Sequence, residues 1–168
     1  MRRILIFLLA FAVLSAVFPA VAAAKDGDGD KSFPTVKYKN ERFNFEIDYP
    51  DIFTYARESE NGDGITLMNN ERMVILLLWG AMNYSGIRAG EYYDMRKFEI
   101  GDCHVMSAAL AGTFGDLEYE RDGIYFFEVF KLNNKSGIYC RFSCPKRKKY
   151  EYKPSLKIIK ECIKKTEI

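Results

Sequence analysis

The chain has 168 residues, with 25 lysine and arginine side chains against 23 aspartate and glutamate side chains. The only charges among the first 24 residues are Arg2 and Arg3, so residues 25–168 carry 25 minus 2, or 23, basic side chains and the same 23 acidic ones. A balanced chain has no overall attraction to nucleic acid or to anionic lipid. We therefore expect no nucleic-acid partner, and any anionic partner has to be met by a local basic patch.

The first 24 residues have the pattern of a cleaved secretory signal peptide. Arg2 and Arg3 form a short basic start, residues 4–18 are almost entirely apolar, and three alanines at 22–24 supply the small residues of a cleavage site. The apolar run is shorter than the ~20 residues of a membrane span, although an uncleaved anchor is the alternative. We expect an extracytoplasmic protein, periplasmic or secreted, with no integral membrane span after cleavage.

Residues 25–36 are predicted to form a flexible tether, and residues 37–168 a single domain. The aspartates of the tether match the first ligand positions of a calcium loop, but Lys31 and Lys37 stand where that loop requires glycine and glutamate. Alternating glycine and aspartate is typical of a solvated segment that buries no apolar surface. The remaining ~130 residues are the usual size of one domain.

The hydrophobic pattern of this domain is mostly that of β-strands. Apolar and polar residues alternate from Phe43 to Tyr49 and stop at Pro50, which indicates a strand with one buried face. Seven successive apolar residues, from Met73 to Trp79, suit a central strand covered on both faces. Further strands are expected at residues 65–68, 104–110, 124–132 and 137–144, and the last two are joined by a hairpin through residues 133–137.

Two helices are expected beside these strands. Residues 91–98 place Tyr92, Met95 and Phe98 on one helical face, and Pro154 suits the first turn of a final helix. Strands with few helices and tight turns predict an α+β domain, in which an antiparallel sheet of about six strands is sandwiched by helices. The apolar stripe of the final helix consists of Leu156, Ile159, Cys162 and Ile163.

Three segments of the domain carry a family resemblance. They are residues 38–50 (Tyr-Lys-Asn-Glu-Arg-Phe-Asn-Phe-Glu-Ile-Asp-Tyr-Pro), residues 60–64 (Glu-Asn-Gly-Asp-Gly) and residues 138–145 (Ile-Tyr-Cys-Arg-Phe-Ser-Cys-Pro), the last followed by the final helix. In these segments the chain resembles small bacterial envelope proteins of the PsbP-like class. The resemblance implies an antiparallel sheet sandwiched by helices, as in the photosystem PsbP subunit and a nuclear Ran-binding protein, and a role in binding proteins rather than in catalysis. Cys144 departs from the pattern, since an aromatic residue is usual before the proline, and no functional residue carries over.

The four cysteines favour disulfide bonds over a zinc site in an oxidising compartment. Cys140 and Cys144 lie four residues apart on one strand, roughly 13 Å, which is too far for a bond between them. Cys162 lies on the helix stripe expected to cover the face that carries Cys144. We therefore expect a Cys144–Cys162 bridge, with Cys103 left for Cys140, and no metal site or cofactor.

Catalytic patterns are few. A strand directs His104, the only histidine, away from Cys103, so these neighbours do not form a nucleophile and base pair. Glu118 and Glu120 are a carboxylate pair of the kind that glycan hydrolysis uses, but alternating acids on an exposed strand are commonly a solvated face.

A run of four cations flanked by tyrosines, at residues 146–153, is the candidate binding site. It is expected to contact an anionic surface, a cell-wall polymer or an acidic protein, and a solvated loop is the alternative. The predicted function is a non-enzymatic envelope binding or accessory module that contacts another protein; a small cell-wall hydrolase and a small-ligand carrier are the alternatives. The candidate site residues are Lys146, Arg147, Lys148, Lys149, Tyr150 and Tyr152.

Mass spectrometry of the protein from an exporting host should find an N-terminus near Lys25. The basic start, the short apolar run and the alanine triplet at residues 22–24 together provide what a signal peptidase recognises. An intact Met1 in the exported protein would contradict the signal-peptide interpretation.

Overall fold

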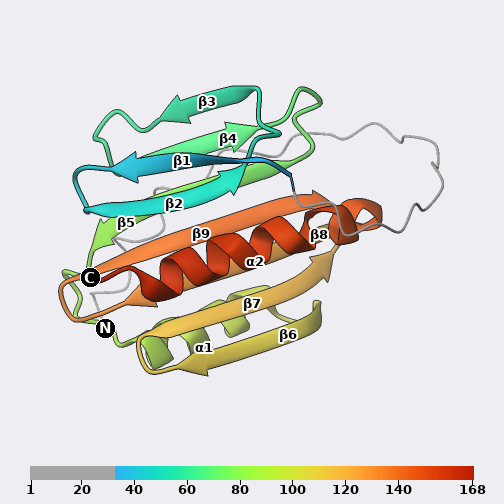
Figure 1. Cartoon of the computed structure of the whole chain (residues 1–168). Helices are drawn as coiled ribbons and strands as arrows, with labels where there is room; N and C mark the ends of the chain where they lie inside the picture. Colours follow the sequence, from blue (N-terminus) through green and yellow to red (C-terminus); the bar gives the residue numbers. More distant parts are fainter. Residues whose placement is uncertain (1–32) are drawn as a thin grey trace.

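The computed structural model describes residues 33–168, so the predicted signal peptide and most of the predicted tether lie outside the described residues. Over this range the chain forms a seven-stranded antiparallel sheet, ordered β3-β4-β5-β9-β8-β7-β6, and a two-stranded hairpin, β1-β2 (Figure 1). The strands are β1 (Thr35–Asn40), β2 (Phe45–Pro50), β3 (Tyr55–Glu58), β4 (Gly64–Met68), β5 (Ile75–Met82), β6 (His104–Ala111), β7 (Phe114–Arg121), β8 (Ile124–Leu132) and β9 (Ser136–Pro145).

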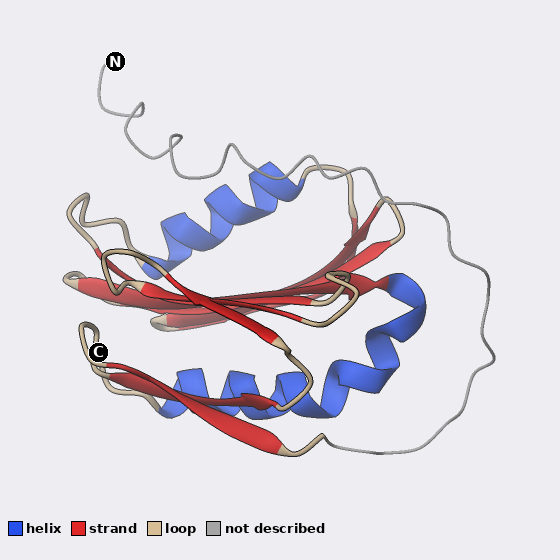
Figure 2. Ribbon diagram, turned by 90° about the horizontal axis from the view of Figure 1, so that it is seen from above, coloured by secondary structure: helices blue, strands red, loops and turns tan. Residues whose placement is uncertain are grey.

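Three layers make up the domain. Helix α1 (Ala89–Ile100) covers one face of the large sheet, and helix α2 (Lys149–Lys165) lies on the other face together with the β1-β2 hairpin (Figure 2). A short 3-10 turn, η1 (Lys146–Lys148), joins β9 to α2 and reverses the chain direction, so α2 runs back along β9. The predicted α+β sandwich is therefore confirmed, with more strands than the sequence pattern indicated.

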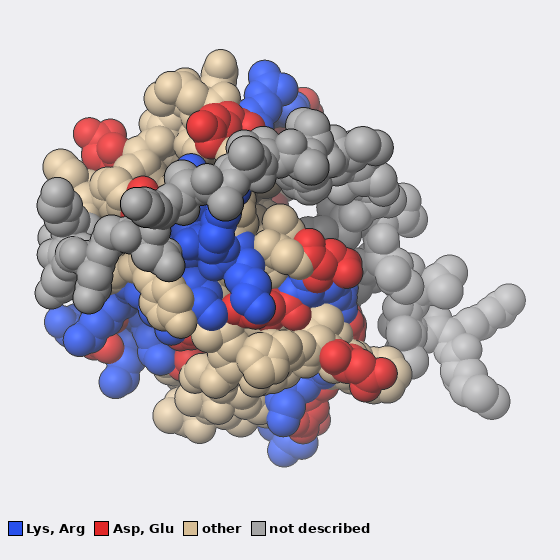
Figure 3. Space-filling view, turned by 90° about the vertical axis from the view of Figure 1, so that its right-hand side faces the viewer, with Lys and Arg blue, Asp and Glu red and all other residues tan. Residues whose placement is uncertain are grey.

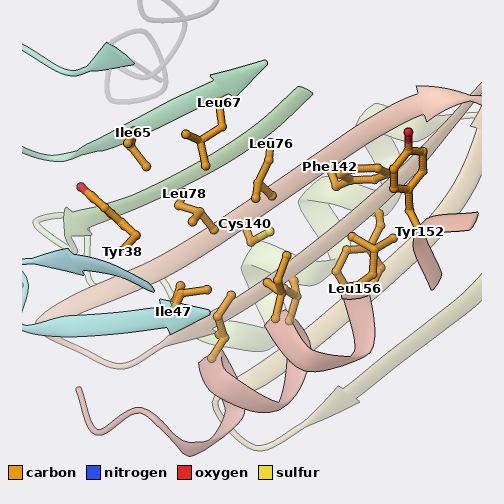
Figure 4. Packing of buried hydrophobic residues seen from close by; sticks show 14 of the residues in the cluster. Tyr38, Ile47, Ile65, Leu67, Leu76, Leu78, Cys140, Phe142, Tyr152 and Leu156 are labelled. Atoms are coloured by element: carbon orange, nitrogen blue, oxygen red, sulfur yellow. The ribbon is translucent and has the colours of Figure 1, made fainter. Parts of the chain in front are cut away.

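The main core lies between the large sheet, α2 and the hairpin. The predicted helix stripe is confirmed, because Leu156, Ile159 and Ile163 are all buried against β9 and its neighbours. Ile47 of β2 is also fully buried there, as the alternation from Phe43 to Tyr49 predicted. Figure 4 shows how side chains from the hairpin, the sheet and α2 meet in this one cluster.

Helix α1 presents a different face to the sheet from the predicted one. Tyr92 does pack inward, with its ring 4.8 Å from that of Phe130. Met95 and Phe98, predicted to share its face, are exposed, and the exposed fraction of Phe98 is 87%. Instead Arg96 turns toward the sheet, because a buried glutamate on β8 holds its guanidinium group.

Helix α2 begins at Lys149, earlier than the sequence indicated. Pro154 therefore lies in the second turn of the helix instead of the first. Proline lacks the N–H that would bond the carbonyl four residues earlier, which belongs to Tyr150. Because Tyr150 is exposed, water can reach that region, and the helix continues through Pro154 to Lys165.

Ile159→Ala should lower the free energy of unfolding by about 2–5 kcal/mol, because it removes buried methyl groups and leaves a cavity under α2. Lys157→Ala, on the exposed side of the same helix, should change it by less than about 0.5 kcal/mol. Urea unfolding followed by circular dichroism measures both variants. Equal losses for the two would contradict the packing of α2 on the sheet.

Candidate binding surface

A ladder of ion pairs joins β7 to the segment that contains η1 and α2. Along β7, every second residue from Asp116 to Glu120 is acidic and points toward α2, where a lysine meets it. We call this set the acid–lysine ladder. The distances from lysine Nζ to carboxylate oxygen in its three pairs are 2.7 Å for Glu120–Lys149, 3.3 Å for Glu118–Lys153 and 2.8 Å for Asp116–Lys160. Lys146 of η1 also pairs with Glu120, at 2.6 Å.

The ladder fits the two elements in length and direction. The four residue-to-residue steps of the strand from Asp116 to Glu120 span about 13 Å, and the eleven steps of the helix from Lys149 to Lys160 span about 16 Å. The last acid, Glu120, pairs with the first lysine of α2, and the first acid, Asp116, pairs with Lys160. This order requires α2 to run antiparallel to β7. The interpretation of Glu118 and Glu120 as a solvated face is therefore wrong, since Glu120 is buried and both acids are paired with lysines.

Glu120 is held in its ionised form. Hydrogen bonds from Lys146 and Lys149 lower the pKa of the Glu120 carboxyl to about 2. The same contact with Glu120 raises the pKa of Lys149. A general acid in glycan hydrolysis needs a carboxyl whose pKa is raised, so the geometry at Glu120 suits an ion pair rather than proton transfer.

The candidate binding residues lie at the corner where β9 passes through η1 into α2. The structure divides them into two groups. Lys149 and Tyr152 are buried: Lys149 Nζ binds Glu120, and the Tyr152 ring packs 5.4 Å from that of Phe142. Lys148 is half-buried and lies 3.6 Å from Glu71. The exposed members of the run are Lys146, Arg147 and Tyr150, and we call these three residues the corner surface.

Figure 3 shows this end of the molecule, with cationic side chains directly beside acidic ones. Lys146 keeps more than half of its side chain exposed while it pairs with Glu120. The Tyr150 side chain is 70% exposed. Its ring centroid lies 4.9 Å from Lys149 Nζ and 5.8 Å from Lys153 Nζ, so two anchored lysines of the ladder flank it.

The opposite face of the sheet carries a second buried charge that the sequence reading missed. Glu128 of β8 accepts hydrogen bonds from Arg96 at 2.8 and 3.0 Å and from the Tyr119 hydroxyl at 2.7 Å. Arg141 of β9 is 2.9 Å away. Burial opposes ionisation, but the hydrogen bond from Arg96 and the charges of both arginines outweigh it and lower the pKa of Glu128. A lone glutamate within the apolar run 124–132 was the signal for this cluster, which fastens α1 to the sheet.

The predicted Cys144–Cys162 bridge is wrong, since the structure shows all four cysteines as free thiols. The face was predicted correctly, because Cys144 is buried under α2 and Cys162 packs against the same core. The reason lies in the direction of α2. Lys131, which is opposite Ile138 at the start of β9, donates to Thr166 O at 2.6 Å, so the Cys162 end of the helix lies far from Cys144 at the end of β9.

The second predicted bridge, Cys103–Cys140, is wrong for another reason. Cys140 belongs to the core on the α2 face, whereas Cys103 packs with Ile100 and Leu117 on the α1 face. The sheet separates the two thiols. Cys103 Sγ instead accepts a hydrogen bond from Arg121 Nε at 2.9 Å.

Two further findings concern possible ligands and membranes. Within residues 33–168 no group of three or more His, Cys, Asp or Glu side chains is arranged to hold a metal ion, and His104 is exposed at the start of β6. Neither helix in the described part of the chain has the length and apolar character needed to cross a bilayer.

Comparison with known proteins identifies the fold. The solution structure of cyanobacterial PsbP (CyanoP) from Synechocystis sp. PCC 6803 matches 82% of this chain and 96% of that chain, with a TM-score of 0.56 and 12% sequence identity. The chain therefore has a PsbP-like fold. No family model and no curated protein sequence matches it. At this level of identity the PsbP-like fold is what the two proteins share, and the roles of individual residues rest on the geometry described above.

Glu120→Gln should remove a pH-dependent part of the stability. The folded pKa of Glu120 lies below its unfolded value, so the wild type gains about 2 kcal/mol above pH ~4.5 and loses it as the pH falls toward 2. The variant should therefore be less stable at pH 7, and the difference should vanish near pH 2.

Urea unfolding at a series of pH values measures this difference. Glu41→Gln is the matched control, because Glu41 forms an exposed pair with Lys39 at 2.8 Å, and exposed pairs contribute little. A Glu120→Gln variant as stable as the wild type at pH 7 would contradict the acid–lysine ladder as a source of stability.

Proposed function

We propose that this protein is a non-enzymatic binding module of the cell envelope, and that the corner surface contacts another protein. The observation that carries this proposal is Tyr150, a large aromatic side chain that is 70% exposed at the start of α2, three residues after the exposed Arg147. Tyrosine and arginine are enriched among the residues that dominate binding energy at interfaces. A tyrosine in this position offers a broad contact area to a partner.

The corner surface is already ordered before a partner arrives. Lys149 Nζ lies over the Tyr150 ring and at the same time binds Glu120 Oε1 at 2.7 Å. The ion pair with Glu120 therefore fixes the Lys149 ammonium group beside the Tyr150 ring. The 3-10 turn η1 holds the backbone that precedes Lys149. A preordered side chain loses little conformational entropy on binding, which favours affinity.

The chemistry of the corner favours a partner with an acidic rim. Lys146 and Arg147 are exposed at this end of the domain, although Glu120 offsets part of the charge of Lys146. Since residues 25–168 are electrically balanced overall, such a partner has to recognise this local surface. The envelope location in the proposal rests on the signal-peptide pattern of residues 1–24.

The double variant Arg147→Ala/Tyr150→Ala tests the proposal. Cross-linking of the tagged protein in envelope extract, followed by affinity purification and mass spectrometry, should show loss of the captured partner by tenfold or more. The melting temperature should change by no more than about 2 °C, because both side chains are exposed. Raising the salt concentration should weaken wild-type capture, since the rim contacts are charged.

Tyr84→Ala is the matched control, because Tyr84 is 88% exposed in the loop before α1. It should leave capture unchanged. Equal capture by the wild type and the double variant would refute the corner surface as the contact site. Turnover of a cell-wall polymer by the purified protein would refute the non-enzymatic role.

A further inference from the structure

The two edge strands of the large sheet differ in how well they are protected against pairing with another chain. Within residues 33–168 the sheet ends in β3 on one side and in β6 on the other (Figure 1). β3 has only four residues, and Arg57 and Glu58 are two of them. A short, charged edge strand of this kind discourages pairing with another chain.

The β6 edge has no such protection. It is eight residues long, and every residue except Met106 is exposed. No aspartate, glutamate, lysine or arginine occurs between Asp102 and Asp116, although 29% of the whole chain is charged. A long, exposed and uncharged edge presents unpaired backbone N–H and C=O groups to an incoming strand.

Only part of β6 is regular enough to pair with another strand. Its pairing with β7 is irregular between Val105 and Ser107, where the register shifts. From Ser107 to Ala111 each residue pairs with one residue of β7. This regular segment has the sequence Ser-Ala-Ala-Leu-Ala, so small side chains occupy all but one position and allow a second strand to approach closely.

We propose that β6 pairs in antiparallel fashion with the β6 strand of a second copy of this chain, through Ser107 to Ala111. The two-fold axis then passes beside Ala109, which faces Ala109 of the other copy. Ala108 lies opposite Leu110 of the other copy, and the two sheets become continuous. This surface is separate from the corner surface and does not rest on the proposed function.

The absence of charged side chains from this segment favours a second copy of the chain as the partner. Pairing a strand with its own copy places like side chains close together at the two-fold axis, and like charges there are destabilising. A segment without charges avoids this repulsion. The second copy also brings its strand already extended and held by β7, so it loses less conformational entropy than a free peptide segment would.

The proposed pairing also accounts for an exposed leucine. Leu110 lies on the α1 face of the sheet, opposite Gly115 of β7 and next to Gly90 of α1. It is 41% exposed in one copy. The two-fold axis is perpendicular to the sheet, so both α1 helices lie on the same face and Leu110 packs across the junction on Ala108 of the other copy.

Sedimentation equilibrium of the protein expressed from the full sequence tests this proposal, with the N-terminus of the purified form read by mass spectrometry. The wild type should sediment with twice the mass of one chain at tens of micromolar. Ala109→Lys places two lysines beside the axis and should give a monomer that keeps the circular dichroism spectrum of the wild type. Ala56→Lys introduces the same residue on the opposite edge, in β3, and should remain a dimer.

Amide hydrogen exchange gives a measurement that depends on no variant. Alternate amides from Ser107 to Ala111 should exchange at least tenfold more slowly in the concentrated wild type than after dilution below the dissociation constant. A monomeric wild type, a dimer that Ala109→Lys leaves intact, or exchange at these amides that is independent of concentration would each overturn the proposal. So would β6 protection that appears only when another protein is added.

Discussion

The burial of Asp116 and Glu120 beneath α2 is the constraint on which the rest of this domain depends. Two carboxylates that face the interior are costly unless cations meet them, because charge is poorly solvated there. The lysines that meet them lie at the first residue of α2 and two thirds of the way along it. The ladder thus sets where α2 begins and which way it runs. Its direction in turn places Leu156, Ile159 and Ile163 over the buried face of β9.

The same ladder changes the meaning of the basic run. Four consecutive cations look like a single anion-binding patch in the sequence. In the folded chain Lys149 is a buried structural residue, and Lys146 and Lys148 lie beside glutamates of the same domain. The exposed part of the basic run is therefore less a concentration of charge than an exposed tyrosine with lysines close to its ring.

Local sequence patterns located six of the nine strands in the described part of the chain, and they did not reveal the partners of the buried charged side chains. β8 begins at Ile124 and ends at Leu132 as predicted, because a run of β-branched and aromatic residues bounded by turns determines it. The inward face of α1 was predicted wrongly because a salt bridge between Arg96 and Glu128, 32 residues apart in the chain, decides it. The cysteine pairing failed in a similar way. Spacing predicted which face Cys144 and Cys162 share, but only the direction of α2 along β9 decides which end of that face each occupies.

The burial of two cysteines under α2 has a consequence for their reactivity. In the described fold Cys140 and Cys144 contribute to the core as small apolar side chains, with no bond between them. Cys140 and Cys144 are sealed under α2, and burial raises the pKa of Cys144 to about 12, so the reactive thiolate is scarce there. Thiol–disulfide exchange requires an accessible thiolate, so these two buried thiols are poor substrates for it.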